Sequence, residues 1–207
     1  CLSVTDGPLG MTSNTYDTAT NRLLSHTDAS GQTTTWTVNA LGDVLSITDA
    51  TGATTGYAYD AMHNLVSKTD AMSQVWTITR DVNENPTEFQ DPLGNTVRYS
   101  YTTEGYVVTA EDQRGFVTTY ARDTYGHVTG ITDPAGFTTT IGRNIRGAVT
   151  AVTTRRGNTY TVMLDDLDRV TSVQIPSGDL YTVSYASPRG PQIQTIVDPT
   201  GAVVSYG

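Results

Sequence analysis

Five aspartates recur at a spacing of 21 residues and are the first candidates for chemistry in this sequence. They are Asp49, Asp70, Asp91, Asp112 and Asp133. Paired carboxylates can share a proton in acid catalysis, or chelate Ca²⁺ through oxygens at about 2.4 Å. If each aspartate occupies the same place in successive two-strand units, neighbours lie on the order of 10 Å apart, because strands are spaced by about 4.8 Å. That separation is too large for either chemistry, so the sequence favours a role in capping turns.

Three arginines share another position of the same period, and this position elsewhere holds apolar residues or tyrosine. The arginines are Arg80, Arg122 and Arg143, and the other members are Val38, Tyr59, Tyr101, Leu164 and Tyr185. An arginine among apolar residues must pair, stack on an aromatic ring or reach water, because an unpaired buried charge is costly. One interpretation is a polar strip that contacts cargo or an anionic glycan. The favoured one is cross-strand stacking on tyrosines.

No other residue types converge on a catalytic or metal site. His26, His63 and His127 fall at different positions of the period, and serines are scattered among turns and strands. The only cysteine is Cys1, so neither an internal disulfide nor a cysteine-based metal site can form. We therefore expect no enzymatic activity, no metal and no cofactor. Cys1 is either the end of a fragment, which is favoured, or the lipid-bearing first residue of a bacterial lipoprotein.

The elements that position these residues follow from the 21-residue period itself. One column of the repeat has no polar member: Trp36, Tyr57, Ile78, Tyr99, Tyr120, Ile141, Val162 and Val183. A second column favours glycine: Gly52, Ser73, Gly94, Gly115, Gly136, Gly157 and Gly178. Such self-similarity indicates an array of short units that bury their apolar faces by stacking on their neighbours.

Each repeat is predicted to be one β-hairpin. Asp91-Pro92-Leu93-Gly94 is a turn, because aspartate bonds its own backbone, proline presets φ and glycine accepts positive φ. The alternation over 96–101 predicts a half-buried strand, 102–105 a second turn and 106–111 a second strand. Tyr57, Tyr99 and Tyr120 should be more buried than Thr96 and Ser100, because they share the column without a polar member.

The second strand carries two apolar columns that are three residues apart. They begin at Val44 and Ile47 and continue through Leu65 and Lys68 to Val170 and Val173. A spacing of three places the columns on opposite faces of an ideal strand. Either both faces are partly covered or a β-bulge resets the register, and the sequence leaves this choice open.

Composition supports one continuous all-β array over residues 1–207, with about nine repeats, about 18 strands and almost no helix. Only 16% of the 207 residues are charged, the net charge is −9, and Thr and Tyr suit a half-exposed sheet. We expect no nucleic-acid partner, because no basic run in the sequence is longer than Arg155-Arg156. No apolar stretch approaches a membrane span, and no signal peptide is present in this segment. Residues 6–10 resemble the closing turn of an earlier repeat and no capping repeat is visible, so we interpret the chain as a fragment of a longer repeat protein.

The repeats resemble the YD repeats of the rearrangement-hotspot (Rhs) family. The resemblance rests on a Tyr-Asp or Arg-Asp pair, a glycine-containing turn, an apolar strand and a closing Asp-Pro-x-Gly. Examples are Tyr59-Asp60, Arg80-Asp81 with Asp91-Pro92-Leu93-Gly94, and Arg122-Asp123 with Asp133-Pro134-Ala135-Gly136. The match covers essentially the whole chain, and its specificity comes from the number of copies. Departures lie late, where Thr154 and Ile175 replace the closing aspartate and Asn144 and Ala186 replace the aspartate of the pair.

The resemblance implies a long β-sheet that spirals into part of a hollow shell. Shells of this kind enclose a carboxy-terminal toxin domain in bacterial polymorphic toxins and insecticidal toxin complexes, and a related shell occurs in teneurins. The expected function is therefore a non-catalytic shell segment of a secreted or cell-surface bacterial protein, with Arg80, Arg122 and Arg143 as possible inner-wall contacts. Its partners would be other repeats and a toxin domain of the same polypeptide. Carbohydrate and secretion-apparatus proteins are further candidate partners. The alternative is a cell-surface adhesion or glycan-binding array.

Overall fold

The computed structural model describes residues 2–5 and 11–206, and its described part consists of strands and turns without a helix. Cys1 and the turn expected at residues 6–10 lie outside the described residues. The chain divides into two compact units, Cys1–Tyr99 and Ser100–Gly207, with the boundary inside one strand. Among the residues described, the structure therefore offers no helix long and apolar enough to cross a membrane.

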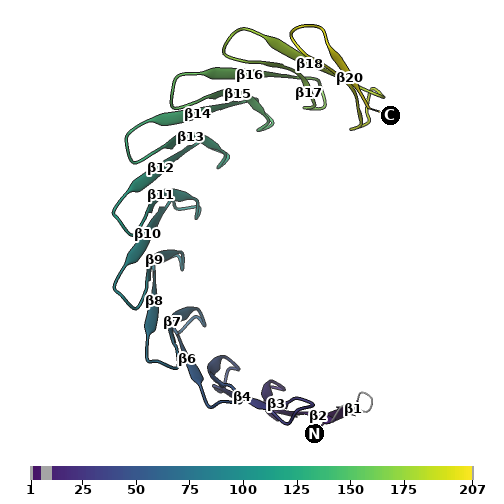
Figure 1. Cartoon of the computed structure of the whole chain (residues 1–207). Coiled ribbons are helices and arrows are strands. Elements are labelled where there is room, and N and C mark those ends of the chain that lie inside the picture. Colours follow the sequence, from purple (N-terminus) through teal and green to yellow (C-terminus); the bar gives the residue numbers. More distant parts are fainter. Residues whose placement is uncertain (1, 6–10, 207) are drawn as a thin grey trace. The chain divides into compact units, whose positions relative to one another are not determined.

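Antiparallel strands follow one another in sequence order within each unit (Figure 1). In the first unit the strands are β1 (Leu2–Thr5), β2 (Met11–Tyr16), β3 (Leu23–Thr27), β4 (Thr33–Val38), β5 (Val44–Thr48), β6 (Thr54–Tyr59), β7 (Leu65–Thr69), β8 (Val75–Arg80) and β9 (Pro86–Gln90), with β10 (Thr96–Tyr101) at the boundary. In the second they are β11 (Val107–Glu111), β12 (Val117–Arg122), β13 (Val128–Thr132), β14 (Thr138–Arg143), β15 (Val149–Thr153), β16 (Thr159–Leu164), β17 (Val170–Gln174), β18 (Leu180–Tyr185), β19 (Ile193–Val197) and β20 (Val203–Ser205). The predicted array of 21-residue hairpins is confirmed, and partial repeats at each end add strands to the expected 18.

A β-bulge explains the two apolar columns of the second strand. Val38 pairs with Val44 while Thr37 pairs with Ser46, so Leu45 is an extra residue in β5. The same shift occurs in every described pairing across a Tyr-Asp turn, for example between Ala121 and Arg122. Because the bulge resets the alternation, Val44 and Ile47 lie on the same face as Trp36 and Val38.

The two faces of the sheet therefore differ in chemistry. The apolar face contains the columns of Trp36, Val38, Val44 and Ile47. It also contains the column two residues before that of Trp36, to which Trp76 belongs. The opposite hydroxyl face is rich in threonine and serine, which form side-chain hydrogen bonds between strands. Such bonds join Thr37 with Ser46 at 2.7 Å, Thr48 with Thr54 at 2.8 Å and Thr153 with Thr159 at 2.9 Å. Cross-strand hydroxyl pairs of this kind stabilise a sheet modestly.

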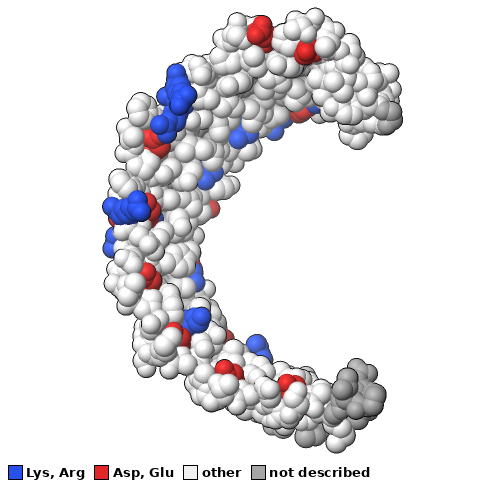
Figure 2. All heavy atoms as spheres, viewed as in Figure 1, with Lys and Arg blue, Asp and Glu red and all other residues white. Residues whose placement is uncertain are grey.

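The sheet of each unit is a single layer, so the tyrosine column does not lie in a packed core. No apolar side chain among the described residues is buried. Tyr57, Tyr99 and Tyr120 are half-buried and Ser100 is exposed, but Thr96 is half-buried as well. Within each unit, no second layer lies over these tyrosines. Most of the surface in view is uncharged, with Asp and Glu in small separate patches (Figure 2).

Candidate functional site

The recurring aspartates bond the backbone of their own turns. Asp49 Oδ1 accepts the N–H groups of Thr51 at 2.8 Å and Ala53 at 3.0 Å, and the Thr51 hydroxyl at 2.6 Å. Asp70, Asp91, Asp112 and Asp133 accept the two equivalent N–H groups at 2.9–3.0 Å. The Thr51 hydroxyl, followed by the backbone donors, holds the pKa of Asp49 below its usual value. Among the described residues, no three His, Cys, Asp or Glu side chains form a group that could hold a metal ion.

The turn itself does not depend on the aspartate. Each closing turn has an N–H···O bond from its fourth residue to its first, as from Gly52 to Asp49 at 3.0 Å. The fourth residue has positive φ, +89° at Gly52, which explains the glycine column. The remaining members at Gly94, Gly115, Gly136, Gly157 and Gly178 share this conformation, as does Ser73. Thr154 and Ile175 keep the same backbone bonds, so the late departures from the motif preserve the hairpins.

The second row of turns, which follows the Tyr-Asp pairs, has the same geometry. Asp81 Oδ1 accepts the N–H groups of Asn83 at 2.9 Å and Asn85 at 3.0 Å. Asn144, which replaces an aspartate, accepts the equivalent groups of Arg146 and Ala148, both at 3.0 Å. The two rows differ in what joins successive hairpins, and this second row carries the denser side-chain contacts.

The three arginines of the repeat column bond to backbone carbonyls. Arg80, Arg122 and Arg143 each donate from Nη1 to the backbone carbonyl of the fourth residue of the following turn, at 2.8–2.9 Å. Nε of Arg122 and Arg143 also donates to Val107 and Val128, at 3.4 and 3.2 Å. The aromatic stacking that the sequence favoured is found at Arg122, whose guanidinium lies 5.2 Å from the Tyr106 ring centre.

Tyrosine performs the same task as arginine in this column. The Tyr185 hydroxyl donates to the Val170 carbonyl at 2.9 Å, again 15 residues earlier in the chain. These carbonyls lie where neighbouring hairpins diverge: β17 and β18 share only three residue pairs, whereas β16 and β17 share four and a bulge. An unpaired carbonyl costs free energy, so a side-chain donor at this position stabilises the joint between hairpins where the column supplies one. Tyr and Arg are interchangeable here because both reach it.

Successive Tyr-Asp turns interlock through a residue that the sequence analysis missed. It is the residue directly after the positive-φ residue of one turn, and it contacts the positive-φ residue of the next turn. The Tyr106 ring lies so close to Gly126 that a Cβ there would overlap it, and the His127 ring would lie 2.8 Å from a Cβ at Gly147. Arg22 has the same relation to Gly42, at 2.8 Å. Where the earlier residue is short, the later one reaches back, as His63 Nδ1 does to Asp43 Oδ2 at 2.7 Å.

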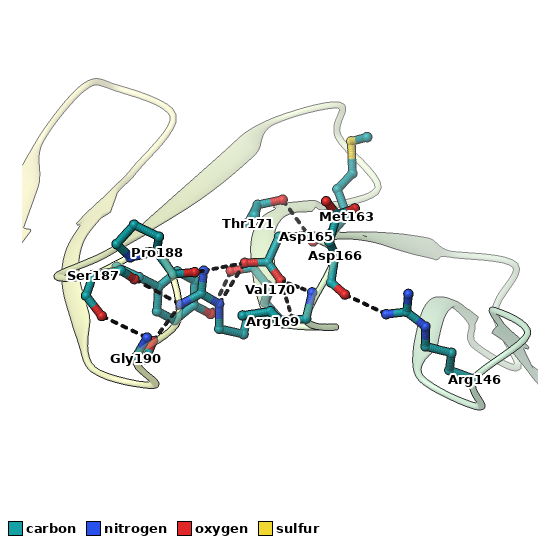
Figure 3. A network of polar contacts seen from close by, with 12 residues as sticks. Arg146, Met163, Asp165, Asp166, Arg169, Val170, Thr171, Ser187, Pro188 and Gly190 are labelled. Atoms are coloured by element: carbon teal, nitrogen blue, oxygen red, sulfur yellow. Dashed lines mark hydrogen bonds and ion pairs between the residues drawn. The ribbon is translucent and has the colours of Figure 1, made fainter.

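The longest of these turns is held by Arg169 (Figure 3). Arg169 donates to the carbonyls of Ser187 at 3.1 Å, Pro188 at 2.8 Å and Gly190 at 2.5 Å. Its Nε also pairs with Asp165 Oδ2 at 2.7 Å, and its guanidinium lies 4.2 Å from the Tyr185 ring centre. The side chain is only 18% exposed. The two extra residues of the last repeat are thus accommodated by one guanidinium that bonds three carbonyls.

Comparison with known proteins supports this fold. Residues 38–75 match the family model described as RHS Repeat, which confirms the resemblance to Rhs repeats. None of the curated proteins matches the chain. The crystal structure of TcdB2-TccC3 is similar with a TM-score of 0.64 at 14% identity, over 95% of this chain and 14% of that chain. The Photorhabdus luminescens Tc holotoxin pore has a TM-score of 0.59 at 15% identity, over 94% of this chain and 14% of that chain. The chain thus spans about one seventh of each of these solved chains.

Proposed function

We propose that this chain is a non-catalytic segment of a shell wall in a secreted or cell-surface bacterial Rhs-type protein, and that the shell encloses a carboxy-terminal toxin domain of the same polypeptide. The single-layer sheet carries this proposal. The accessible surface is 13598 Å², whereas a compact monomer of 22.2 kDa exposes about 9,400 Å². A sheet with this excess surface suits a wall whose second side is covered by other polypeptide. Further repeats and the enclosed domain would be its partners.

Limited proteolysis of the full-length protein tests enclosure. The carboxy-terminal domain should resist a protease that is too large to enter the shell, until the shell itself unfolds. The same domain expressed alone is the control and should be cut rapidly. Equal cleavage rates for the enclosed and the free domain would contradict the proposal.

A glycan-binding array is the second candidate, and one cavity favours it. This cavity of about 420 Å³ lies between two Tyr-Asp turns and is lined by Glu104, Tyr106, Tyr120, Arg122 and Asp123, among others. Two tyrosines beside charged hydrogen-bonding groups suit a sugar ring. A glycan array probed with the chain and with a Tyr106→Ala variant would test it, because binding that survives the substitution would exclude this cavity.

A further inference from the structure

The apolar face carries positive charge only. Lys68, Arg80, Arg122 and Arg143 project from its columns, and no described carboxylate does. Glu88 and Glu111 are the strand carboxylates, and both lie on the hydroxyl face. The remaining described acids lie in the turns. In a chain with a net charge of −9, the apolar face of each unit is therefore cationic, with Lys68 and Arg80 in the first unit and Arg122 and Arg143 in the second.

The four cations have neutral partners within the chain. Lys68 Nζ lies 5.2 Å from the centre of the Trp76 ring, and the arginines bond to the carbonyls described above. In the described residues, none of the four forms an ion pair with a carboxylate. The sheet thus orients these charges, and one of them, Arg80, also attracts a turn carboxylate: the backbone N–H of Asn64 and, to a smaller extent, Arg80 lower the pKa of Asp60.

The same face would be stabilised by burial against another polypeptide. The accessible surface of the whole chain, with both faces of the sheet and the turns included, exceeds that of a compact monomer of 22.2 kDa by about 4,000 Å², and obligate interfaces bury about 2,000–5,000 Å². Half-buried aromatic and aliphatic columns such as that of Trp36 make this face, rather than the hydroxyl face, the one that gains from burial. A covering polypeptide would gain most if it met the apolar columns with apolar side chains and the cations with carboxylates.

We propose that the apolar face binds a polypeptide that presents acidic and apolar side chains, and that this face is turned toward the enclosed domain. The second clause rests on the shell function proposed above. The first rests on the charge and burial of this face alone.

The two tryptophans of the chain are built-in probes for this face. Trp36 and Trp76 are the only ones, and both lie on it in the first unit. Two amphipathic peptides with identical apolar residues, one with glutamate and one with lysine at every polar position, are titrated against the chain while tryptophan fluorescence is recorded. We expect the glutamate peptide to bind at least about ten-fold tighter at low salt, with the preference lost near 1 M salt, where the screening length is about 3 Å.

Charge-removing variants locate the effect. Lys68→Gln should weaken glutamate-peptide binding about three-fold, and the Lys68→Gln, Arg80→Gln double variant about ten-fold. Arg98→Gln removes the same charge from the hydroxyl face, where Arg98 pairs with Glu88 at 2.7 Å, and should change binding less than two-fold. If the double variant is less stable than the parent chain, Lys68→Gln alone is the test of charge. In the described contacts, Lys68 makes no bond to the backbone that this substitution would remove.

Several outcomes would overturn the inference. These are equal affinity for the two peptides, no fluorescence change with either, or an equal loss in Arg98→Gln. Anionic lipid vesicles that match the glutamate peptide would indicate a membrane surface, and a dimer that buries both tryptophans would indicate a second copy; either result contradicts an acidic polypeptide partner. Protease resistance in the full-length protein addresses enclosure separately, so a failure of one test is distinguishable from a failure of the other.

Discussion

Gly126→Ala is the sharpest test of the interlock between successive Tyr-Asp turns. Gly126 has φ +86°, and a Cβ there would overlap the Tyr106 ring. Two costs follow from the structure. The left-handed conformation costs an alanine about 1–2 kcal/mol. Displacing the ring adds about 1–3 kcal/mol, through overpacking and the loss of the Arg122 contact at 5.2 Å.

Gly115→Ala is the matched control in the same unit. Gly115 has φ +81°, and a Cβ there would meet nothing within 4 Å. It should therefore show the backbone cost alone. Thermal melting followed by circular dichroism measures both variants, at about 2–4 °C per kcal/mol for a chain of this size.

A double-substitution cycle isolates the ring contact. In a Tyr106→Ala background, Gly126→Ala should cost no more than Gly115→Ala does in the parent chain. Equal costs for the two glycine variants in the parent chain, or an unchanged Gly126→Ala cost without the ring, would refute the interlock.

Three further predictions concern the carbonyl donors, the turn carboxylates and the open face. Arg143→Met should destabilise the chain by about 1–3 kcal/mol in thermal melts, because the Val128 and Gly147 carbonyls lose their donors, and Arg143→Tyr should recover part of the loss. The Asn95 side chain and then the backbone donors lower the pKa of Asp91, so its contribution is present above the unfolded value of about 3.9 and is lost as the pH falls through the folded pKa; Asp91→Asn should flatten this part of a melting series from pH 7 to pH 2.5. The 207-residue chain should sediment as aggregates at concentrations where a form extended by several repeats at each end stays monodisperse, since its end strands β1 and β20 expose unpaired backbone groups; a cooperative monomer would contradict this.

The period predicted the hairpins because turn chemistry is local. The segment Asp91-Pro92-Leu93-Gly94 specifies its own turn, because it has a carboxylate within reach of two N–H groups and a glycine at the positive-φ position. The same reasoning identified the strand over 96–101, which the structure shows as Thr96–Tyr101. Side chains and backbone groups within five residues of one another sufficed for these features.

The bulge and the missing core could not be deduced in the same way. A spacing of three between Val44 and Ile47 is compatible with two covered faces or with a reset register, and only the pairing of Val38 with Val44 decides. Burial is likewise a property of what lies above the sheet. A column such as Tyr57, Tyr99 and Tyr120 shows which side prefers to be covered, without showing whether this stretch of chain provides the cover.

The interlock left a signal in the sequence that a single-column analysis does not detect. Tyr106 precedes Gly126 by 20 residues and His127 precedes Gly147 by the same interval, whereas Asp43 precedes a histidine, His63. Only the comparison of two columns in adjacent repeats shows that a large residue is followed by glycine and a short acceptor by a donor. Such a rule becomes visible once the geometry shows that these columns meet.

The Tyr-Asp pair acquires a physical meaning from these contacts. In a sheet without a core, adjacent hairpins are joined by three or four residue pairs of the backbone ladder, three of them between β17 and β18. Side chains that bridge the end where the strands diverge add to this ladder. In Arg122-Asp123, the aspartate accepts backbone N–H groups of its own turn, and the arginine donates across the gap to a carbonyl 15 residues earlier. Tyr185, which precedes Ala186, donates to the equivalent carbonyl. One residue of the pair thus serves the hairpin and the other serves the joint between hairpins. The contacts within each turn and the contacts between adjacent hairpins both involve nearest neighbours only. The stability of the array should therefore accumulate repeat by repeat rather than through a shared interior.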